Sequence, residues 1–293
     1  MKTERQITLA VHLARSLRAA RRDYRRRLKR CRKKFSEKAV HDLRVETRRL
    51  LTLLDFMEAA QLADSPGKTR KMLKRRLDAF DDLRDTQVQL QLLQPLGREF
   101  PGVKRLRKLL RRQEQRLVKQ TRKNVEHAKP GGLWPRLKAL EKQIRAATIA
   151  TPQADGHQAA VAPLQKSFDR VVRLRRRIHG DDAAAIHKLR IAFKRFRYLS
   201  ELLRPFLPWL TQDQLRRMRE FQASAGDIQD LEILLTRLDE FVQEKKLPAG
   251  ALRSLRNELA RRKHRAVNLF KKQIAALQEF QPDERAAQSS ATG

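Results

Sequence analysis

One segment of the chain occurs twice, and this repeat limits the possible folds more than any other feature. Residues 39–50 align without gaps to residues 185–196. A second pair of related segments, 83–88 and 225–230, follows the two copies in the same order. Self-similarity at this spacing indicates that the chain is built from two related halves.

Both halves have the composition of helices. Glycine (10) and proline (11) are scarce among 293 residues, and they separate segments rich in strong helix formers such as Leu, Ala, Arg and Lys. The helices expected are about 6–35, 36–62, 68–93 and 101–128, then 162–179, 183–204, 211–245 and 248–282. We therefore predict an all-α protein with two four-helix halves, about 6–128 and 162–280. The stretch 129–161, with one short helix at 135–148, is expected to link them, and 281–293 to form a disordered tail.

Helix ends and buried faces are also predicted. Ser36, Asp182 and Thr211 are expected to cap helices. The first helix has one apolar seam: Ile7, Ala10, Ala14, Leu17, Tyr24, Leu28, Cys31 and Phe35. The single cysteine allows no intramolecular disulfide or metal cluster and fits a reducing compartment, so we expect a cytoplasmic protein. No apolar run approaches the roughly 20 residues of a membrane span.

The charge balance points to a polyanionic partner. The chain has 68 Lys and Arg residues against 33 Asp and Glu, a net charge of +35. A chain this basic repels itself, and it gains free energy from binding a polyanion whose counterions are released. Nucleic acid, an anionic membrane and inorganic polyphosphate all meet this description.

The repeated segments place part of this charge on two helix faces. At 100° per residue, His41, Arg44, Arg48 and Arg49 share the face opposite the apolar residues. The second copy places His187, Arg190, Lys194 and Arg195 in the same way, with Arg197 beside the boundary. Like charges at this spacing repel one another. Because Arg and His can both donate to phosphate oxygens, this repeated face favours phosphate contact over a merely solvated surface.

These segments resemble the signatures of the CHAD family, the conserved histidine α-helical domain. The resemblance is carried by four motifs in order: Val40-His41-Asp42-Leu43-Arg44-Val45 with Arg48-Arg49-Leu50, Arg84-Asp85-Thr86-Gln87-Val88, Ile186-His187-Lys188-Leu189-Arg190 with Lys194, Arg197 and Tyr198, and Gly226-Asp227-Ile228-Gln229-Asp230. It implies one domain over about 5–280, formed by two pseudo-symmetric four-helix bundles. The basic helices would line a central cavity that binds inorganic polyphosphate.

The resemblance also implies which residues bind. The polyphosphate-binding residues would be His41, Arg44, Arg48, Arg49, His187, Arg190, Lys194 and Arg197. The sequence departs from the family at Leu51, where Arg is frequent, and at Gln87, where an acidic residue is common.

Other residues are candidates for supporting roles. Asp85 and Asp227 would either orient the cations or cap a local break in a helix. Arg21 and Arg175 lie on apolar seams and would either extend the cavity or snorkel to solvent. Gly226, unfavourable inside a helix, predicts a kink or a close approach of the backbone.

Rival functions are less well supported. Phosphoryl transfer or polyphosphate hydrolysis would call for metal-binding carboxylates or a phosphate-binding glycine loop, and the sequence shows no P-loop motif and no acidic cluster beside the basic helices. We expect binding without catalysis, no cofactor and no metal site. Nonspecific nucleic-acid binding is the main alternative, although only 5% of residues are aromatic. Oligomeric state and an association with polyphosphate granules are left open.

Overall fold

The computed structural model describes residues 8–62, 66–127, 132–150, 156–180, 182–245, 247–248, 250 and 252–282. In these ranges the regular structure is helical and no strand occurs, so the all-α prediction is confirmed. The longer helices are α1 (Leu9–Lys34), α2 (Glu37–Ala59), α3 (Gly67–Asp78), α4 (Asp81–Leu93), α5 (Val103–His127), α6 (Leu133–Ala150), α7 (Gly156–Arg175), α8 (Ala183–Leu203), α9 (Gln212–Glu244) and α10 (Arg253–Ile274). Short 3₁₀ helices lie at Pro95–Gly97, Arg204–Phe206 and Ala275–Phe280. None of the described helices is both long and apolar enough to cross a membrane.

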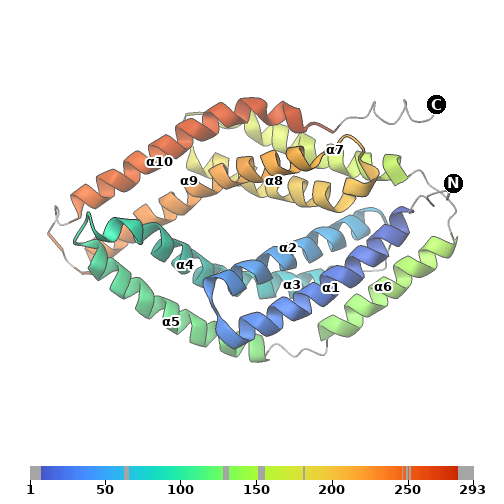
Figure 1. Cartoon of the computed structure of the whole chain (residues 1–293), viewed down its shortest axis with the longest axis horizontal. Coiled ribbons are helices and arrows are strands. Elements are labelled where there is room, and N and C mark those ends of the chain that lie inside the picture. The colour runs from blue at the N-terminus through green and yellow to red at the C-terminus, as the bar shows by residue number, and fades with distance from the viewer. Residues whose placement is uncertain are drawn as a thin grey trace.

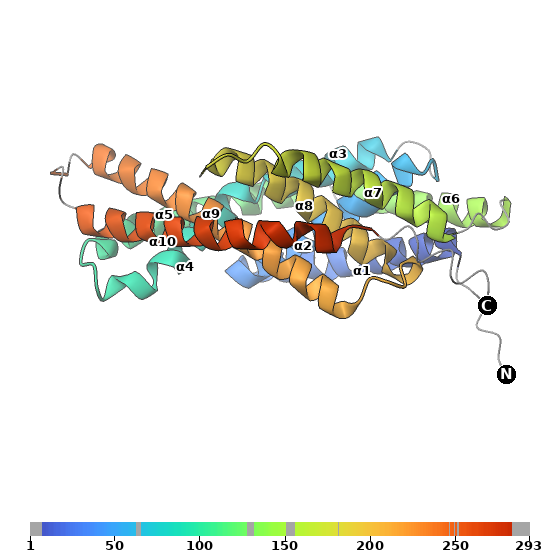
Figure 2. The ribbon, with the colours of Figure 1, turned by 90° about the horizontal axis from the view of Figure 1, so that it is seen from above.

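The helices form two groups that face each other along the length of the molecule (Figure 1). Helices α7 to α10 pack in sequence on one side, while α1 packs with α2 and α6 on the other side and α2 also contacts α3. The α4–α5 pair extends to the far ends of α9 and α10. Viewed at 90°, the molecule is elongated (Figure 2). Contacts of α2 with α8 and of α4 with α9 join the two groups.

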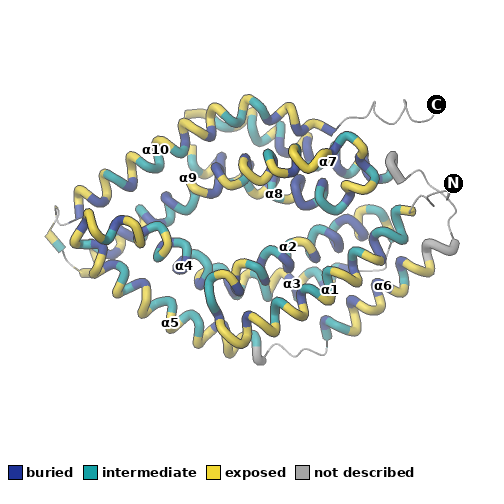
Figure 3. Tube along the Cα trace, viewed as in Figure 1, coloured by how far each residue is buried: buried dark blue, intermediate teal, exposed yellow. Residues whose placement is uncertain are grey.

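Two hydrophobic cores hold this arrangement. The larger core includes residues from both groups of helices, among them the fully buried Tyr24 of α1 and Phe196 of α8. The smaller core lies where α4 and α5 meet α9 and α10, and it includes Leu106 and Leu238. In Figure 3 buried and exposed positions alternate along the helices, as expected for helices that each bury one face. Because both groups share the larger core, the two halves are not separate bundles.

The predicted caps and the predicted seam are confirmed. The side-chain oxygens of Ser36 and Asp182 accept hydrogen bonds from backbone amides at the starts of α2 and α8, and Thr211 forms a capping box with Gln214 at the start of α9. On α1, the seam residues buried are Ala14, Leu17, Tyr24, Cys31 and Phe35, with Ala10 and Leu28 partly buried. Ile7 lies outside the described residues.

The third predicted helix, 68–93, is wrong, because the structure has two helices with a break at Ala79 and Phe80. The Phe80 ring is buried and stacks on Phe35, with ring centroids 6.4 Å apart. Arg44 of α2 donates to the Leu77 carbonyl oxygen (3.0 Å) near the end of α3. A cation from another helix therefore helps to stabilise the break.

The predicted linker 129–161 is largely helical. Helix α6 packs on α1 and buries Leu133, Leu137 and Ile144, and α7 already begins at Gly156. Residues 128–131 and 151–155 lie outside the described residues, as does 283–293, most of the predicted disordered tail. Since α5 pairs with α4 and α6 joins α1 instead, the prediction of two equivalent four-helix bundles is not confirmed.

Candidate functional site

All four repeated motifs meet where the two groups of helices join. The first motif of each half lies on α2 and α8, which contact each other. The second motif of each half lies on α4 and α9, which also contact each other. The two copies of the repeated sequence therefore surround a single location in the fold.

Four cations come together at this junction: Arg44 and Arg48 of α2, and Arg190 and Lys194 of α8. We call them the cation cluster. Burial and the charges of Arg190, Arg48 and Arg44 lower the pKa of Lys194 to about 6. Burial and the charge of Arg44, with a smaller effect of Arg190, lower the pKa of Arg48 to about 10. The protein thus holds like charges together where water screens them poorly.

A histidine from each half flanks the cation cluster. The pKa of His41 is lowered, because neighbouring groups partly shield its ring from water and because the charge of Arg84 is nearby. His187 is half-buried, and burial together with the charges of Arg190 and Lys194 lowers its pKa, against a hydrogen bond with Gln229. The buried Nδ1 of His187 has no hydrogen-bond partner among the described residues. These rings are therefore biased toward the neutral form unless an anion is nearby.

Carboxylates from α4 and α9 lie beside the cations, and they include Asp85 and Asp227, the two acidic candidates from the sequence. Asp81 Oδ1 lies 2.5 Å from Nη1 of the buried Arg44. Burial raises the pKa of Asp85, of Asp227 and of Asp230. Arg44 opposes this rise at Asp85, and Arg190 opposes it at Asp227 and Asp230. Among the described residues, no three His, Cys, Asp or Glu side chains are placed to hold a metal ion.

The geometry separates two possible roles of these carboxylates. The direct partner of Arg44 is Asp81, at the start of α4, rather than Asp85. Asp85 instead interacts with Arg44 through its charge, and Asp227 interacts with Arg190 in the same way in the other half. Their predicted role in orienting the cations stays a prediction.

Gly226 allows a close approach between α9 and α8. A Cβ atom at this buried position would lie 3.5 Å from both Nε and Nη2 of Arg190. A methyl group would make ordinary contact there, but a larger side chain would displace the guanidinium. The predicted close approach of the backbone is confirmed, within a helix that continues without a break to Glu244.

Besides Arg44, two further predicted site residues are already engaged by carboxylates. Arg197 is buried, with Nη1 2.5 Å from Glu201 Oε1 and Nε donating to Gln222 Oε1 (2.8 Å). Arg49 is exposed, and its guanidinium lies 3.5 Å from Glu46 Oε2 and 4.0 Å from Glu201 Oε2. Their predicted contact with phosphate would compete with these ion pairs.

The two predicted seam arginines lie elsewhere in the fold. Nη2 of Arg21 donates to Glu141 Oε2 of α6 (3.1 Å), so this arginine joins α1 to α6. Arg175 is the half-buried last residue of α7. Neither is among the charges that act on Lys194 or Arg48.

Sequence reasoning missed three members of the site. Arg84 donates to Glu37 Oε1 (2.7 Å), and its charge also acts on His41 and Asp230. Arg84 and Asp230 belong to the repeated motifs of α4 and α9, so a signal for them existed. Asp81 lies at the break between α3 and α4, and no sequence pattern marked it.

Comparison with known proteins supports the family resemblance of the motifs and the all-α fold. The sequence model of the CHAD domain family matches residues 15–239. The crystal structure of the CHAD domain from the plant Ricinus communis is similar, with a TM-score of 0.71, 20% identity, and 92% of this chain and 93% of that chain covered. PptA from Streptomyces chartreusis has a TM-score of 0.64 and 18% identity, over 91% of this chain and 99% of its own. No curated protein sequence matches.

Proposed function

This chain belongs to the CHAD domain family, and on that premise we propose that it binds inorganic polyphosphate, without catalysis, at the junction of α2 and α8. The ligand would contact the cation cluster and the two flanking histidines. The resemblance of the sequence motifs supports polyphosphate as the ligand, and the convergence of those motifs on one place supports the location. The central cavity implied by the resemblance remains part of this proposal.

The observation that carries the proposal is the environment of Lys194. Its charged form is disfavoured by burial and by four surrounding arginines, including the ion-paired Arg197. The neighbouring carboxylates do not restore its pKa. A half-buried cation whose charged form its own protein disfavours is an unfavourable arrangement for folding alone, but a suitable one for an anion that supplies negative charge.

The arrangement favours a ligand whose charges repeat. Arg44 and Arg48 lie one helical turn apart on α2, as Arg190 and Lys194 do on α8, so each helix presents a cation about every 6 Å. A phosphate chain can contact successive turns with successive groups. Nucleic acid offers phosphates too, but its bases would need stacking partners. Tyr198 is an aromatic residue that lies near Arg48. Its ring is already covered by Arg197, whose guanidinium carbon lies 4.3 Å from the ring centroid.

The carboxylates at the junction support binding rather than catalysis. Asp81 is paired with Arg44, and the charges of Arg190, Arg84 and Lys194 act on Asp230. In these positions they balance part of the cluster's charge. Phosphate release from long-chain polyphosphate with a divalent metal, lost in His41→Ala, would show that the site is catalytic instead.

Competition binding at fixed, near-physiological salt tests the ligand. Unlabelled polyphosphate is expected to displace labelled polyphosphate far better than DNA at equal phosphate concentration. The difference should shrink in Arg48→Gln/Lys194→Gln, which removes one cation from each helix. Equal competition by polyphosphate and DNA in the wild type would mean that the chain binds polyanions by net charge only, and the proposal would be wrong.

A further inference from the structure

A basic cavity lies away from the junction, between α1 and three other helices. It has a volume of about 450 Å³, within the range of small-molecule sites. Its walls come from α1, α3, α5 and α6: Arg25, Leu28, Lys29, Arg32, Lys33, Arg76, Val125 and Trp134. None of these residues belongs to the repeated motifs, so the function proposed above makes no use of this cavity.

The charge in this cavity is positive and uncompensated. Five of the eight wall residues are cations and none is a carboxylate. No ion pair to these five cations occurs among the described residues. A neighbouring cavity between α1 and α6 differs, because its Glu141 pairs with Arg21 and Arg145. The cavity at Trp134 therefore attracts an anion more strongly than its neighbour does.

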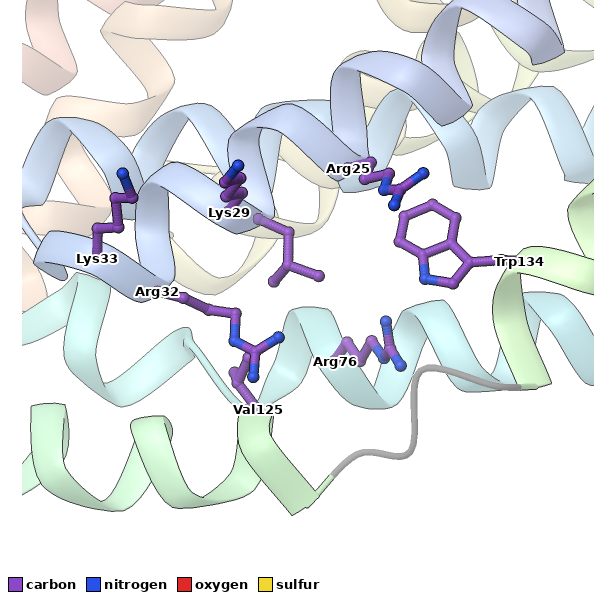
Figure 4. Close-up of a pocket in the computed structure, with 8 residues that line it drawn as sticks. Arg25, Lys29, Arg32, Lys33, Arg76, Val125 and Trp134 are labelled. Carbon is purple, nitrogen blue, oxygen red and sulfur yellow. The ribbon is translucent and has the colours of Figure 1, made fainter.

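The cavity also has an aromatic wall, which the cation cluster lacks. Figure 4 shows the guanidinium groups of Arg32 and Arg76 directed into the space below α1, with the Trp134 indole at one end. Trp134 is half-buried and is supported by the buried Tyr24, with ring centroids 5.8 Å apart. The ring is thus held in place and still partly accessible.

This combination fits a ligand that carries both an aromatic ring and phosphates. An inorganic polyanion gains nothing from an indole, whereas a nucleobase stacks on one irrespective of its identity. Arginine recognises phosphate through its planar fork of donors. We propose that this cavity binds a nucleoside polyphosphate, with the base against Trp134 and the phosphates at Arg32 and Arg76.

The proposal predicts how much of the affinity for a nucleoside polyphosphate comes from its base and how much comes from its phosphates. Stacking of a base on an aromatic side chain corresponds to roughly a 5- to 150-fold gain in affinity. Adenosine triphosphate should therefore bind this cavity at least about fivefold more tightly than inorganic tripolyphosphate, which has the same phosphates without the ring. The removal of Trp134 should abolish the difference, while the removal of Arg32 should weaken both ligands.

Calorimetric titration of the full chain with these two probes tests the assignment. The background is Arg48→Gln/Lys194→Gln, which weakens binding of either triphosphate at the junction. In this background we compare Trp134→Leu and Arg32→Gln with Arg30→Gln, a control on the same helix that is exposed and outside the cavity wall. Arg30→Gln should leave the affinity ratio of the two probes unchanged.

A second measurement leaves the cavity intact. The chain has two tryptophans, so Trp209→Phe makes Trp134 the one remaining indole. Adenosine triphosphate should quench its fluorescence, and tripolyphosphate should quench it much less. Equal affinity for the two probes, or an unchanged ratio in a folded Trp134→Leu, would overturn the proposal. Loss of polyphosphate binding at the junction would leave this result untouched, so the two proposals fail separately.

Discussion

Lys194 gives the most direct prediction of a chemical event on binding. Its pKa is lowered to about 6 in the free protein, so at pH 7 only about a tenth of the molecules carry a proton there. A bound polyphosphate chain would favour the ammonium form and raise this pKa. Binding at pH 7 should therefore take up about 0.9 proton at Lys194, in addition to a smaller uptake at the histidines.

Calorimetry measures this uptake directly. The apparent binding enthalpy at pH 7 is measured in two buffers that differ in ionisation enthalpy, such as PIPES and Tris, and the difference gives the number of protons bound. Lys194→Met removes the titrating group while keeping a side chain of similar length. We expect this variant to lose about 0.9 of the protons taken up by the wild type.

The control is Lys166→Met, at an exposed position of α7. It makes the same substitution at a lysine far from the cation cluster in sequence and should leave the proton uptake unchanged. The reasoning would be refuted by a wild type that takes up no proton, or by a Lys194→Met variant with the wild-type uptake. Either result would mean that Lys194 keeps an ordinary pKa or that the ligand does not approach it.

In the absence of ligand, the lowered pKa of Lys194 should reduce the stability of the folded chain. The ordinary pKa of lysine is 10.5, whereas the pKa of Lys194 in the folded chain is lowered to about 6, so between these values the unfolded chain binds the extra proton. Its contribution to stability therefore falls as the pH decreases from about 10.5 to 6. Without ligand, Lys194→Met should be more stable than the wild type in urea unfolding, and by more at pH 6 than at pH 10. A variant with no pH-dependent gain would contradict the environment described for Lys194.

Three further predictions follow from the junction. Arg48→Gln removes one phosphate contact, so the slope of log affinity against log salt should decrease by about 0.7 to 0.9, and an unchanged slope would remove Arg48 from the site. Polyphosphate affinity should rise as the pH falls toward 6, because Lys194 and the two histidines have lowered pKa values in the free protein and an anion raises them. His41→Gln/His187→Gln should make this rise less steep, and a rise as steep as that of the wild type would assign the pH dependence to Lys194 or other groups. Arg44→Met should destabilise the fold by about 1–3 kcal/mol in urea unfolding, since it leaves the Asp81 pair and the helix break unsupported, whereas wild-type stability would mean that the break forms without Arg44.

Local chemistry in the sequence predicted much of the fold. The caps at Ser36 and Asp182 and the seam of α1 depend on residues within a few turns of one another, so pattern and side-chain type were sufficient. The break at Phe80 depends on Arg44, which lies on another helix, and no local pattern contains that information. The segment of α6 has a weak pattern, so the sequence predicts only a short helix inside a linker there. The packing of α6 against α1 is a tertiary effect that the local pattern does not contain.

The site was predictable to the extent that the repeat marked it. The positions of the cations relative to the buried residues identified the basic faces of α2 and α8. The fold brings the cations at the centres of these two faces together. The sequence could not show that Glu201 of α8 would approach Arg49 of α2, because that depends on how the two helices lie against each other. Nor could it show that Asp230 would face Arg190 across two helices.

The central claim is that a few placed cations, rather than the net charge of +35, carry polyphosphate binding. The direct measurement compares polyphosphate affinity at one near-physiological salt concentration for two variants that each replace one arginine and one lysine by glutamine. Arg48→Gln/Lys194→Gln changes the cation cluster, and Lys166→Gln/Arg173→Gln changes two exposed positions of α7. We predict that the first variant loses at least about tenfold in affinity, as expected for the loss of two charge-assisted contacts, and that the second stays close to the wild type. Equal losses in the two variants would contradict the account.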